Sequence, residues 1–378
     1  MPDEKLTAYR GGKALRRGWT TGSCAAAASQ AAAVLLLTGI APPEIHLHTP
    51  GGITFCLPVE DAHMSGNAAV CTVRKDAGDD PDITNGVRIT ASVRRIEKGV
   101  TIEGGAGVGR ITRPGLAMPV GEAAINPGPR QQIADAVHRA AQQNGYGGGF
   151  SVTISVKDGE ALAAQTYNGH LGIVGGISIL GTSGIVEPMS EKALVDTIRL
   201  ELDSLYAQGQ RIAFLCPGNY GADFARDTLG LDLERAVKCS NFIGEAFDHA
   251  AYRGYSEILL VGHAGKLVKM AAGVMNTHSS VADARQEIFT AHAALCGAPR
   301  ETLEGLMAAI SVDACVELLD EVNLRQPVLS RIGREMETRI ALRMKGQARV
   351  EFIMFTGKYG VLAESAGART LCERLKLQ

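Results

Sequence analysis

Residues 172–190 read GIVGGISILGTSGIVEPMS, and this stretch carries the main prediction about the fold. Its apolar run over 176–180 is short and β-branched, which favours a strand, and an amphipathic helix is expected from about Ser190. Between the two lie four small residues, Gly181, Thr182, Ser183 and Gly184. Such residues let backbone N–H groups face a ligand, so these four are candidate cofactor contacts. The alternative is a glycine turn without a chemical role.

Downstream of this stretch, short apolar runs alternate with amphipathic segments, which is typical of a parallel sheet with flanking helices. The helix predicted over 190–207 carries one apolar stripe, formed by Leu194, Ile198, Leu202 and Leu205. We therefore expect a two-domain α/β protein whose C-terminal domain, 172–378, is a Rossmann-like open parallel sheet with flanking helices. Residues 350–356 and 361–364 are interpreted as a hairpin or as added edge strands.

The turns after the predicted strands contain small and polar residues. They are Gly218, Asn219, Tyr220 and Gly221, then Ser240 and Asn241, then Gly262, His263 and Lys266. In an open parallel sheet these turns line one crevice with the 181–184 turn, so we expect the cofactor there. His263 is the candidate catalytic base and Lys266 a candidate substrate contact. A structural role for the histidine is the alternative.

The N-terminal half has a different pattern. Short strands separated by Gly, Asp and Pro turns predict an α+β domain over 1–171 with a mixed or antiparallel sheet. An alanine-rich helix up to about Leu37 is expected to be capped by Thr21 or Ser23. Two arginines lie just upstream, so its N-terminus could hold a carboxylate. The candidate contacts there are Arg17, Thr20, Thr21 and Ser23. The alternative is a tightly packed, well-capped helix.

A long glycine-rich loop over 103–130 contains Arg110, Arg113 and Arg130. Its glycines are spaced G-x-G-x-G without a helix directly after them, so a dinucleotide fingerprint is a weak interpretation. Guanidinium groups pair with carboxylates in a two-point geometry, which favours a polycarboxylate ligand. Ordinary solvated arginines are the alternative.

Length, net charge and cysteine content limit the classes of protein to which this chain could belong. A chain of 378 residues predicts two domains, and a net charge of -2 gives no basic field, so no nucleic-acid partner is expected. The longest apolar run, over 25–37, is too short to span a membrane, and no signal peptide is expected. The eight scattered cysteines include no C-x-x-C pair, which favours buried thiols in the cytoplasm.

No metal site is predicted. His46 and His48 have metal-compatible spacing on one strand, but two histidines do not make a site. The acidic run over 75–82 lacks the glutamate of an EF-hand loop and is interpreted as a solvated turn.

Four motifs together resemble the CbiD family. They are RGWTTGSCAAA at 17–27, GVGRITRPGL at 107–116, GISILGTSGIVEPMS at 176–190 and GHAGKL at 262–267. The resemblance spans nearly the whole chain in the same order. Members of that family are cobalt-precorrin-5B C(1)-methyltransferases of the anaerobic cobalamin pathway, and they use S-adenosylmethionine.

The resemblance implies methylation of C-1 of cobalt-precorrin-5B to give cobalt-precorrin-6A. Domain 1–171 would bind the tetrapyrrole, a small cobalt-corrinoid precursor, and domain 172–378 would bind S-adenosylmethionine. The usual methyltransferase G-x-G-x-G turn is absent, and no acidic residue closes the strand that ends at Cys216, so this placement rests on crevice geometry. A non-catalytic corrinoid carrier and a nucleotide-dependent oxidoreductase are the alternatives. A homo-oligomer is compatible with the sequence.

Overall fold

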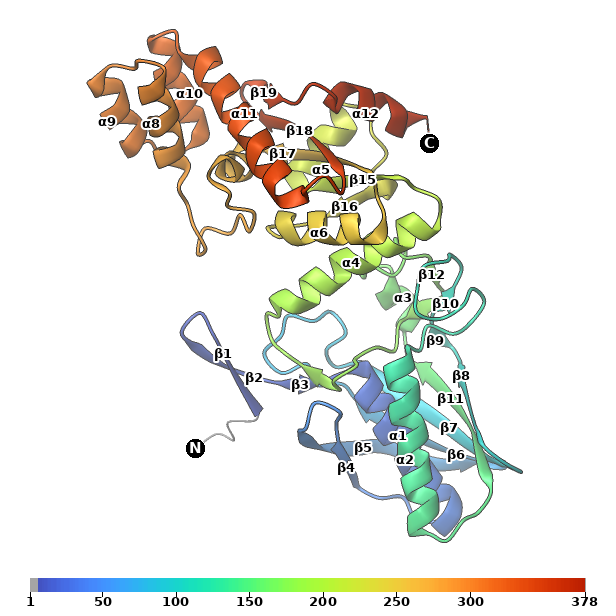
Figure 1. The fold of residues 1–378 in the computed structure, drawn as a ribbon. Helices are drawn as coiled ribbons and strands as arrows, with labels where there is room; N and C mark the ends of the chain where they lie inside the picture. Colours follow the sequence, from blue (N-terminus) through green and yellow to red (C-terminus); the bar gives the residue numbers. More distant parts are fainter. Residues whose placement is uncertain (1–5, 378) are drawn as a thin grey trace. The chain divides into compact units, whose positions relative to one another are not determined.

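The computed structural model describes residues 6–377 and contains two compact units, Met1–Glu191 and Lys192–Gln378 (Figure 1). The division falls later than the boundary expected at residue 172. The reason is strand pairing, because β13 (Gly176–Ile177) pairs with β9 (Gly107–Val108) inside unit 1. The stretch that was expected to open the second domain therefore completes the first.

A six-stranded sheet forms the centre of unit 1. In spatial order its strands are β4 (Glu44–His48), β5 (Thr54–Ser65), β6 (Ala68–Arg74), β7 (Arg88–Ile96), β11 (Gly149–Val156) and β8 (Val100–Gly104). All neighbours are antiparallel except β11 and β8, which are parallel. The expected mixed sheet is confirmed, with apolar residues alternating along the strands toward the core.

Helices α1 (Thr21–Thr38) and α2 (Pro127–Gln143) share one core with this sheet. The alanines of α1 are buried, which allows its neighbours to approach closely. Its N-cap is Thr20, whose side chain accepts a hydrogen bond from the Ser23 amide, rather than either of the two residues expected. By length and hydropathy α1 could span a membrane, but 72% of it is buried inside the protein, as in a core helix.

Smaller elements complete unit 1. They are the hairpin of β1 (Thr7–Arg10) and β2 (Lys13–Arg16), the pair β3 (Gly18–Trp19) and β14 (Ile185–Val186), the pair β10 (Arg110–Ile111) and β12 (Ile173–Val174), and α3 (Gly159–Ala163). The pairs join segments that are far apart in sequence, so the glycine-rich loop and the 172–190 stretch lie side by side.

Unit 2 contains a five-stranded sheet. Its order is β16 (Ala236–Lys238), β15 (Ile212–Cys216), β17 (Glu257–His263), β18 (Arg349–Thr356) and β19 (Gly360–Glu364). The first four strands are parallel, and β19 is antiparallel to β18. The sheet is therefore mixed, and the purely parallel Rossmann-like sheet is not confirmed. The predicted first strand, 176–180, is not part of it, whereas the predicted terminal hairpin is present.

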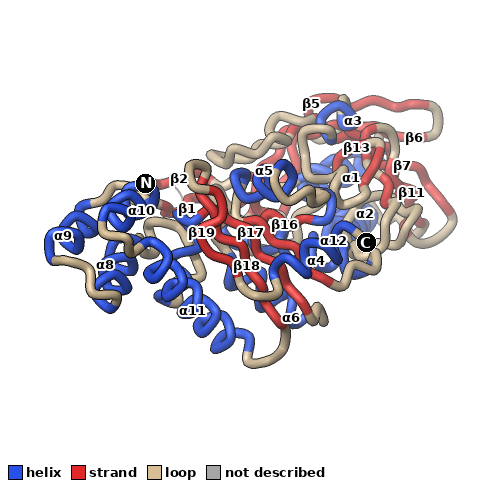
Figure 2. The backbone as a smooth tube through the Cα atoms, turned by 90° about the horizontal axis from the view of Figure 1, so that it is seen from above, coloured by secondary structure: helices blue, strands red, loops and turns tan. Residues whose placement is uncertain are grey.

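Helices cover both faces of this sheet, and Figure 2 shows its strands between α5 and α6. One face packs against α4 (Glu191–Ala207), α6 (Ile243–Arg253) and α11 (Arg325–Met344). The other packs against α5 (Asn219–Asp227) and α12 (Ala368–Lys376). The remaining helices are η2 (Leu233–Arg235), α7 (Ala264–Leu267), η3 (Val268–Ala272), α8 (Arg285–Leu295), α9 (Arg300–Ala308) and α10 (Val312–Glu321).

Candidate functional site

Three of the four predicted turns meet at the carboxyl edge of the unit 2 sheet, after β15, β16 and β17. Lys266 links them, because its Nζ donates a hydrogen bond to the Ser240 carbonyl oxygen at 3.2 Å. A methyl group added at Gly218 would lie 3.5 Å from the same Nζ. The turns of residues 218, 240 and 266 thus form one local site, which we call the strand-end site.

Gly218 gives this site an exposed helix start. Its φ of +112° is a conformation that other residues rarely adopt, and it is the N-cap of α5. No side chain caps α5, so the first backbone N–H groups of the helix are not satisfied by a cap. Such groups attract an anion such as a carboxylate.

An aromatic surface borders the same turn. Tyr220 on α5 is 78% exposed, and its ring centroid lies 6.0 Å from that of His263. Beside it, Lys238 Nζ donates to Asn219 Oδ1 at 3.4 Å. The site therefore offers a flat apolar face next to polar groups, a combination that suits a ring with a polar substituent.

Asn241 is held by a segment that follows η3. The Thr277 amide donates to the Asn241 carbonyl oxygen at 2.9 Å, and the Thr277 hydroxyl lies 3.3 Å from Asn241 Oδ1. This segment is fixed in turn by Lys269, a buried lysine whose Nζ donates to the carbonyl oxygens of Thr277 and Ala282 at 3.2 and 2.8 Å. The sequence analysis did not identify this lysine, because the burial of a lysine has no local signature in the sequence.

His263 is part of the strand-end site, and a hydrogen bond fixes which of its ring nitrogens carries the proton. Its Nδ1 accepts a hydrogen bond from the Gly265 amide at 3.1 Å, so the neutral ring carries its proton on Nε2. Burial lowers the pKa of His263, although Asp313 acts in the opposite direction. The imidazole is therefore neutral near pH 7, and accepting a proton at Nδ1 would break the bond to Gly265. This geometry is a poor one for a general base.

Glu201 on α4 is an acidic residue that sequence reasoning missed. Its side chain is only 9% exposed, and burial raises its pKa to about 7, although the Lys238 amide, which donates to it, and the Lys238 charge act in the opposite direction. The sequence feature that could have indicated its burial is its position directly before Leu202, which belongs to the apolar stripe of the helix. It places a carboxyl group next to β16.

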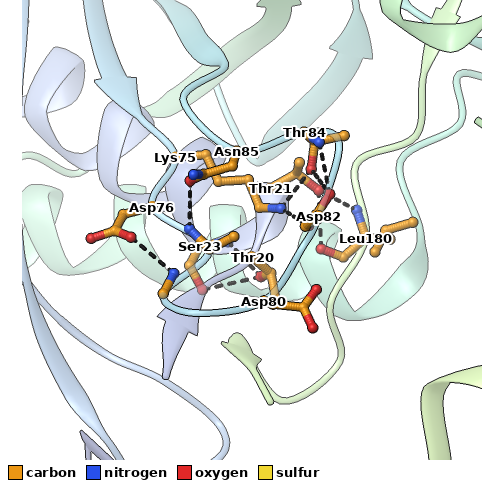
Figure 3. A network of polar contacts seen from close by, with 12 residues as sticks. Thr20, Thr21, Ser23, Lys75, Asp76, Asp80, Asp82, Thr84, Asn85 and Leu180 are labelled. Atoms are coloured by element: carbon orange, nitrogen blue, oxygen red, sulfur yellow. Dashed lines mark hydrogen bonds and ion pairs between the residues drawn. The ribbon is translucent and has the colours of Figure 1, made fainter. Parts of the chain in front are cut away.

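The fourth turn, 181–184, lies in unit 1 and is held against the start of α1 (Figure 3). Ser23 Oγ donates to the Gly184 carbonyl oxygen at 2.7 Å, and Thr21 Oγ1 accepts from the Leu180 amide at 2.9 Å. Thr20, Thr21 and Ser23 are all buried. Contrary to expectation, the four turns do not share one sheet edge, and these hydroxyl groups serve contacts within the protein.

The acidic run over 75–82 is not the solvated turn that was predicted. Lys75 is 3% exposed, and its Nζ contacts Asp82 and donates to Thr84 Oγ1 (Figure 3). Asp80 Oδ1 accepts from the Met189 amide at 2.8 Å. The run therefore fastens the 172–190 stretch within unit 1. A buried lysine among carboxylates could not be recognised from composition alone.

The predicted arginines divide into two groups. Arg17 pairs with Glu187 at 2.7 Å, and Arg130 donates to the carbonyl oxygens of Ile102 and Ile125, so both cross-link unit 1. Arg110 is 56% exposed, donates to the Gly121 carbonyl oxygen, and lies at the long distance of 3.9 Å from the exposed Glu103 carboxylate. Within residues 6–377 we find no hydrogen-bond or ion-pair partner for Arg113. Arg110 and Arg113 are thus the two that can bind an anion.

A pocket of about 630 Å³ in unit 1 contains none of the predicted site residues. Its lining includes Arg74 and Arg88, which both pair with Glu60. Because this carboxylate already neutralises part of their charge, the pocket adds little to the anion-binding surface.

Comparison with known proteins gives consistent matches. The CbiD family model matches residues 8–188, and the CbiD C-terminal domain model matches residues 276–366. A relative from Ruminiclostridium cellulolyticum, named cobalt-precorrin-5B C(1)-methyltransferase, is 50% identical over 92% of this chain and 90% of its own length. A relative of the same name from Citrobacter koseri is 40% identical over the full length of both chains.

A crystal structure of the cobalamin biosynthesis protein CbiD from Archaeoglobus fulgidus is also similar. It is 30% identical, and the match covers 73% of this chain and 86% of that one, with a TM-score of 0.40.

Proposed function

The chain belongs to the CbiD family, and from this premise we propose that it transfers a methyl group from S-adenosylmethionine to C-1 of cobalt-precorrin-5B, giving cobalt-precorrin-6A. The observation that carries the proposal is similarity along nearly the whole chain to relatives named for this reaction. The carrier and oxidoreductase alternatives have no comparable support.

The strand-end site suits S-adenosylmethionine. The cofactor carries a carboxylate, a ribose and an adenine ring, and supplies an activated methyl group on a positively charged sulfur. The uncapped start of α5 at Gly218 can receive the carboxylate, since its amide groups lack a side-chain cap. Tyr220 can stack on the adenine, and Ser240 and Asn241 offer polar groups to the ribose. We propose these residues as the cofactor contacts.

Arg110 and Arg113 are the proposed substrate contacts. A corrinoid precursor carries several acetate and propionate groups, and exposed guanidinium groups pair with carboxylates. Both residues lie on the segment joined to the 172–190 stretch by β10 and β12, which gives the loop a fixed base. We expect them to set substrate affinity rather than chemistry.

The proposed mechanism is in-line displacement, in which a nucleophilic ring carbon attacks the methyl group and the bond from that group to sulfur breaks. The chain contributes by positioning both ligands and excluding water, so no protein nucleophile is required. His263 keeps its Nδ1 bond to Gly265 and shapes the site, with its proton on Nε2.

The test uses cobalt-precorrin-5B and S-adenosylmethionine with an isotope-labelled methyl group. We expect the label at C-1 of the product. Arg110→Gln and Arg113→Gln should raise KM at least about tenfold with little change in kcat, as lost uniform binding requires. Arg94→Gln, a change at an exposed position on β7, is the control. Substrate binding without label transfer would support a carrier and contradict the proposal.

A further inference from the structure

The exposed face of β4 and β5 brings three different metal-binding side chains together. Ligand atoms of Glu44, His46 and Cys56 all lie within 4.8 Å of one another, and all three residues are exposed. They belong to unit 1 and include none of the residues assigned above to methyl transfer. The cluster is therefore a separate feature of the molecule.

Strand register creates this cluster. Antiparallel pairing sets His46 directly opposite Cys56, and Glu44 lies two residues earlier on the same face of β4. His48, the histidine that sequence spacing paired with His46, instead lies opposite Thr54 and bonds its hydroxyl at 3.0 Å. Register could not be read from the sequence, so the cysteine was not connected with the histidines.

The side chains already converge without an ion. His46 Nε2 lies 3.1 Å from Glu44 Oε1, and the Cys56 sulfur lies within 4.8 Å of the ligand atoms of both residues. Zinc binds nitrogen, oxygen and sulfur ligands at about 2.0 to 2.3 Å, so atoms around one ion lie roughly 3 to 4 Å apart. Small rotations of exposed side chains are enough to reach that spacing.

We propose that Glu44, His46 and Cys56 form a surface site for one borderline-soft divalent metal ion such as Zn²⁺ or Co²⁺. A thiolate and an imidazole select such ions over Mg²⁺ and Ca²⁺, which prefer oxygen ligands. On binding, the Cys56 S–H bond breaks, the proton goes to solvent, and a sulfur–metal bond forms. Water occupies the remaining position. The ion would fasten the edge strand β4 to β5.

The experiment titrates Co²⁺ into the full chain after treatment with a chelator. We expect one Co²⁺ per chain, visible d–d bands of a four-coordinate ion, and an ultraviolet sulfur-to-cobalt charge-transfer band. Zn²⁺ should abolish these bands by displacement. Cys56→Ser should remove the charge-transfer band, and His46→Ala should weaken binding at least about tenfold, as expected for loss of one ligand.

Two control variants match these changes. Cys296→Ser removes another thiol that is not fully buried, in unit 2, and should keep the charge-transfer band. His63→Ala removes an exposed histidine that pairs with Asp61 at 3.4 Å without a cysteine, and should leave affinity unchanged. Folding of each variant is checked by circular dichroism.

Two results would overturn the proposal. One is the absence of a charge-transfer band in the folded wild-type chain. The other is a band that persists in Cys56→Ser or disappears in Cys296→Ser, because the bound ion would then lie elsewhere. Methyl-transfer activity is not part of this readout, so failure here leaves the proposed function untouched.

Discussion

The carboxyl group of Glu201 is buried beside β16, and its pKa of about 7 lies well above the ordinary value of 4.5. A group with a raised pKa favours the folded state at low pH, and this contribution is lost as pH rises from 4.5 through 7. Glu201→Gln keeps an acceptor for the Lys238 amide but has no charge. The free energy of unfolding of Glu201→Gln, minus that of wild type, should therefore rise by about 3 kcal/mol between pH 4 and pH 8. Each unit by which the folded pKa exceeds the ordinary pKa contributes about 1.4 kcal/mol.

Urea unfolding of both proteins at pH 4, 6 and 8 measures this difference. Glu337→Gln, an exposed change on α11, is the control and should show no such trend. A Glu201→Gln variant that gains no stability between pH 4 and pH 8 would show that the wild-type carboxyl group is not buried in the folded protein.

His263 should act through structure and not as a base. We expect His263→Ala to lower kcat for methyl transfer less than about tenfold, whereas loss of a general base costs 10²-fold or more. His263→Asn should restore most of the activity, because asparagine also accepts a hydrogen bond from an amide at a helix start. Steady-state kinetics of the two variants measure this loss. A 10²-fold lower kcat in both variants would show that His263 transfers a proton.

Among the elements, α1 depends on small side chains. Ala28 is fully buried, and α1 packs closely on α2 and β7. Ala28→Leu should lower the free energy of unfolding by about 1 to 3 kcal/mol, because extra methylene groups overpack a dense core. Ala341→Leu, on the exposed side of α11, makes the same chemical change and should be nearly neutral. A shift in the urea midpoint that is equal for both would contradict tight packing of α1.

Local elements could be predicted well from the sequence, and their partners could not. The helix over 190–207 was identified by its apolar stripe and is α4. The run over 176–180 has the composition of a parallel strand, but pairing with β9 decides its place. Pairing depends on contacts far away in the chain, which periodicity does not encode.

The same limit applies to the candidate site. Gly218 and Ser240 were predicted together because turns at one edge of a parallel sheet meet. Glu201 was missed because it reaches the sheet from a helix, and Cys56 because register sets its neighbour. The expectation that all thiols are buried fails at Cys56, which is exposed, and at Cys296, which is half-buried.

At the scale of the whole molecule, two compact units carry different groups of candidate residues. Unit 1 holds the arginine loop, and unit 2 holds the strand-end site. Strands β18 and β19 join the second sheet after a long helical stretch, so segments from both ends of unit 2 form one sheet. We propose that the macrocycle binds to unit 1 and the methyl donor to unit 2.

Calorimetric titration with S-adenosylhomocysteine tests whether the methyl donor binds at the strand-end site. Gly218→Val should abolish binding, since a branched side chain blocks the start of α5. Gly209→Val is the matched control, because Gly209 has a similar φ of +99° but precedes the opposite end of β15. We predict that wild type and Gly209→Val each bind one molecule. A wild-type chain that does not bind, or a folded Gly218→Val variant that binds as tightly as the control, would show that the methyl donor does not bind at the start of α5.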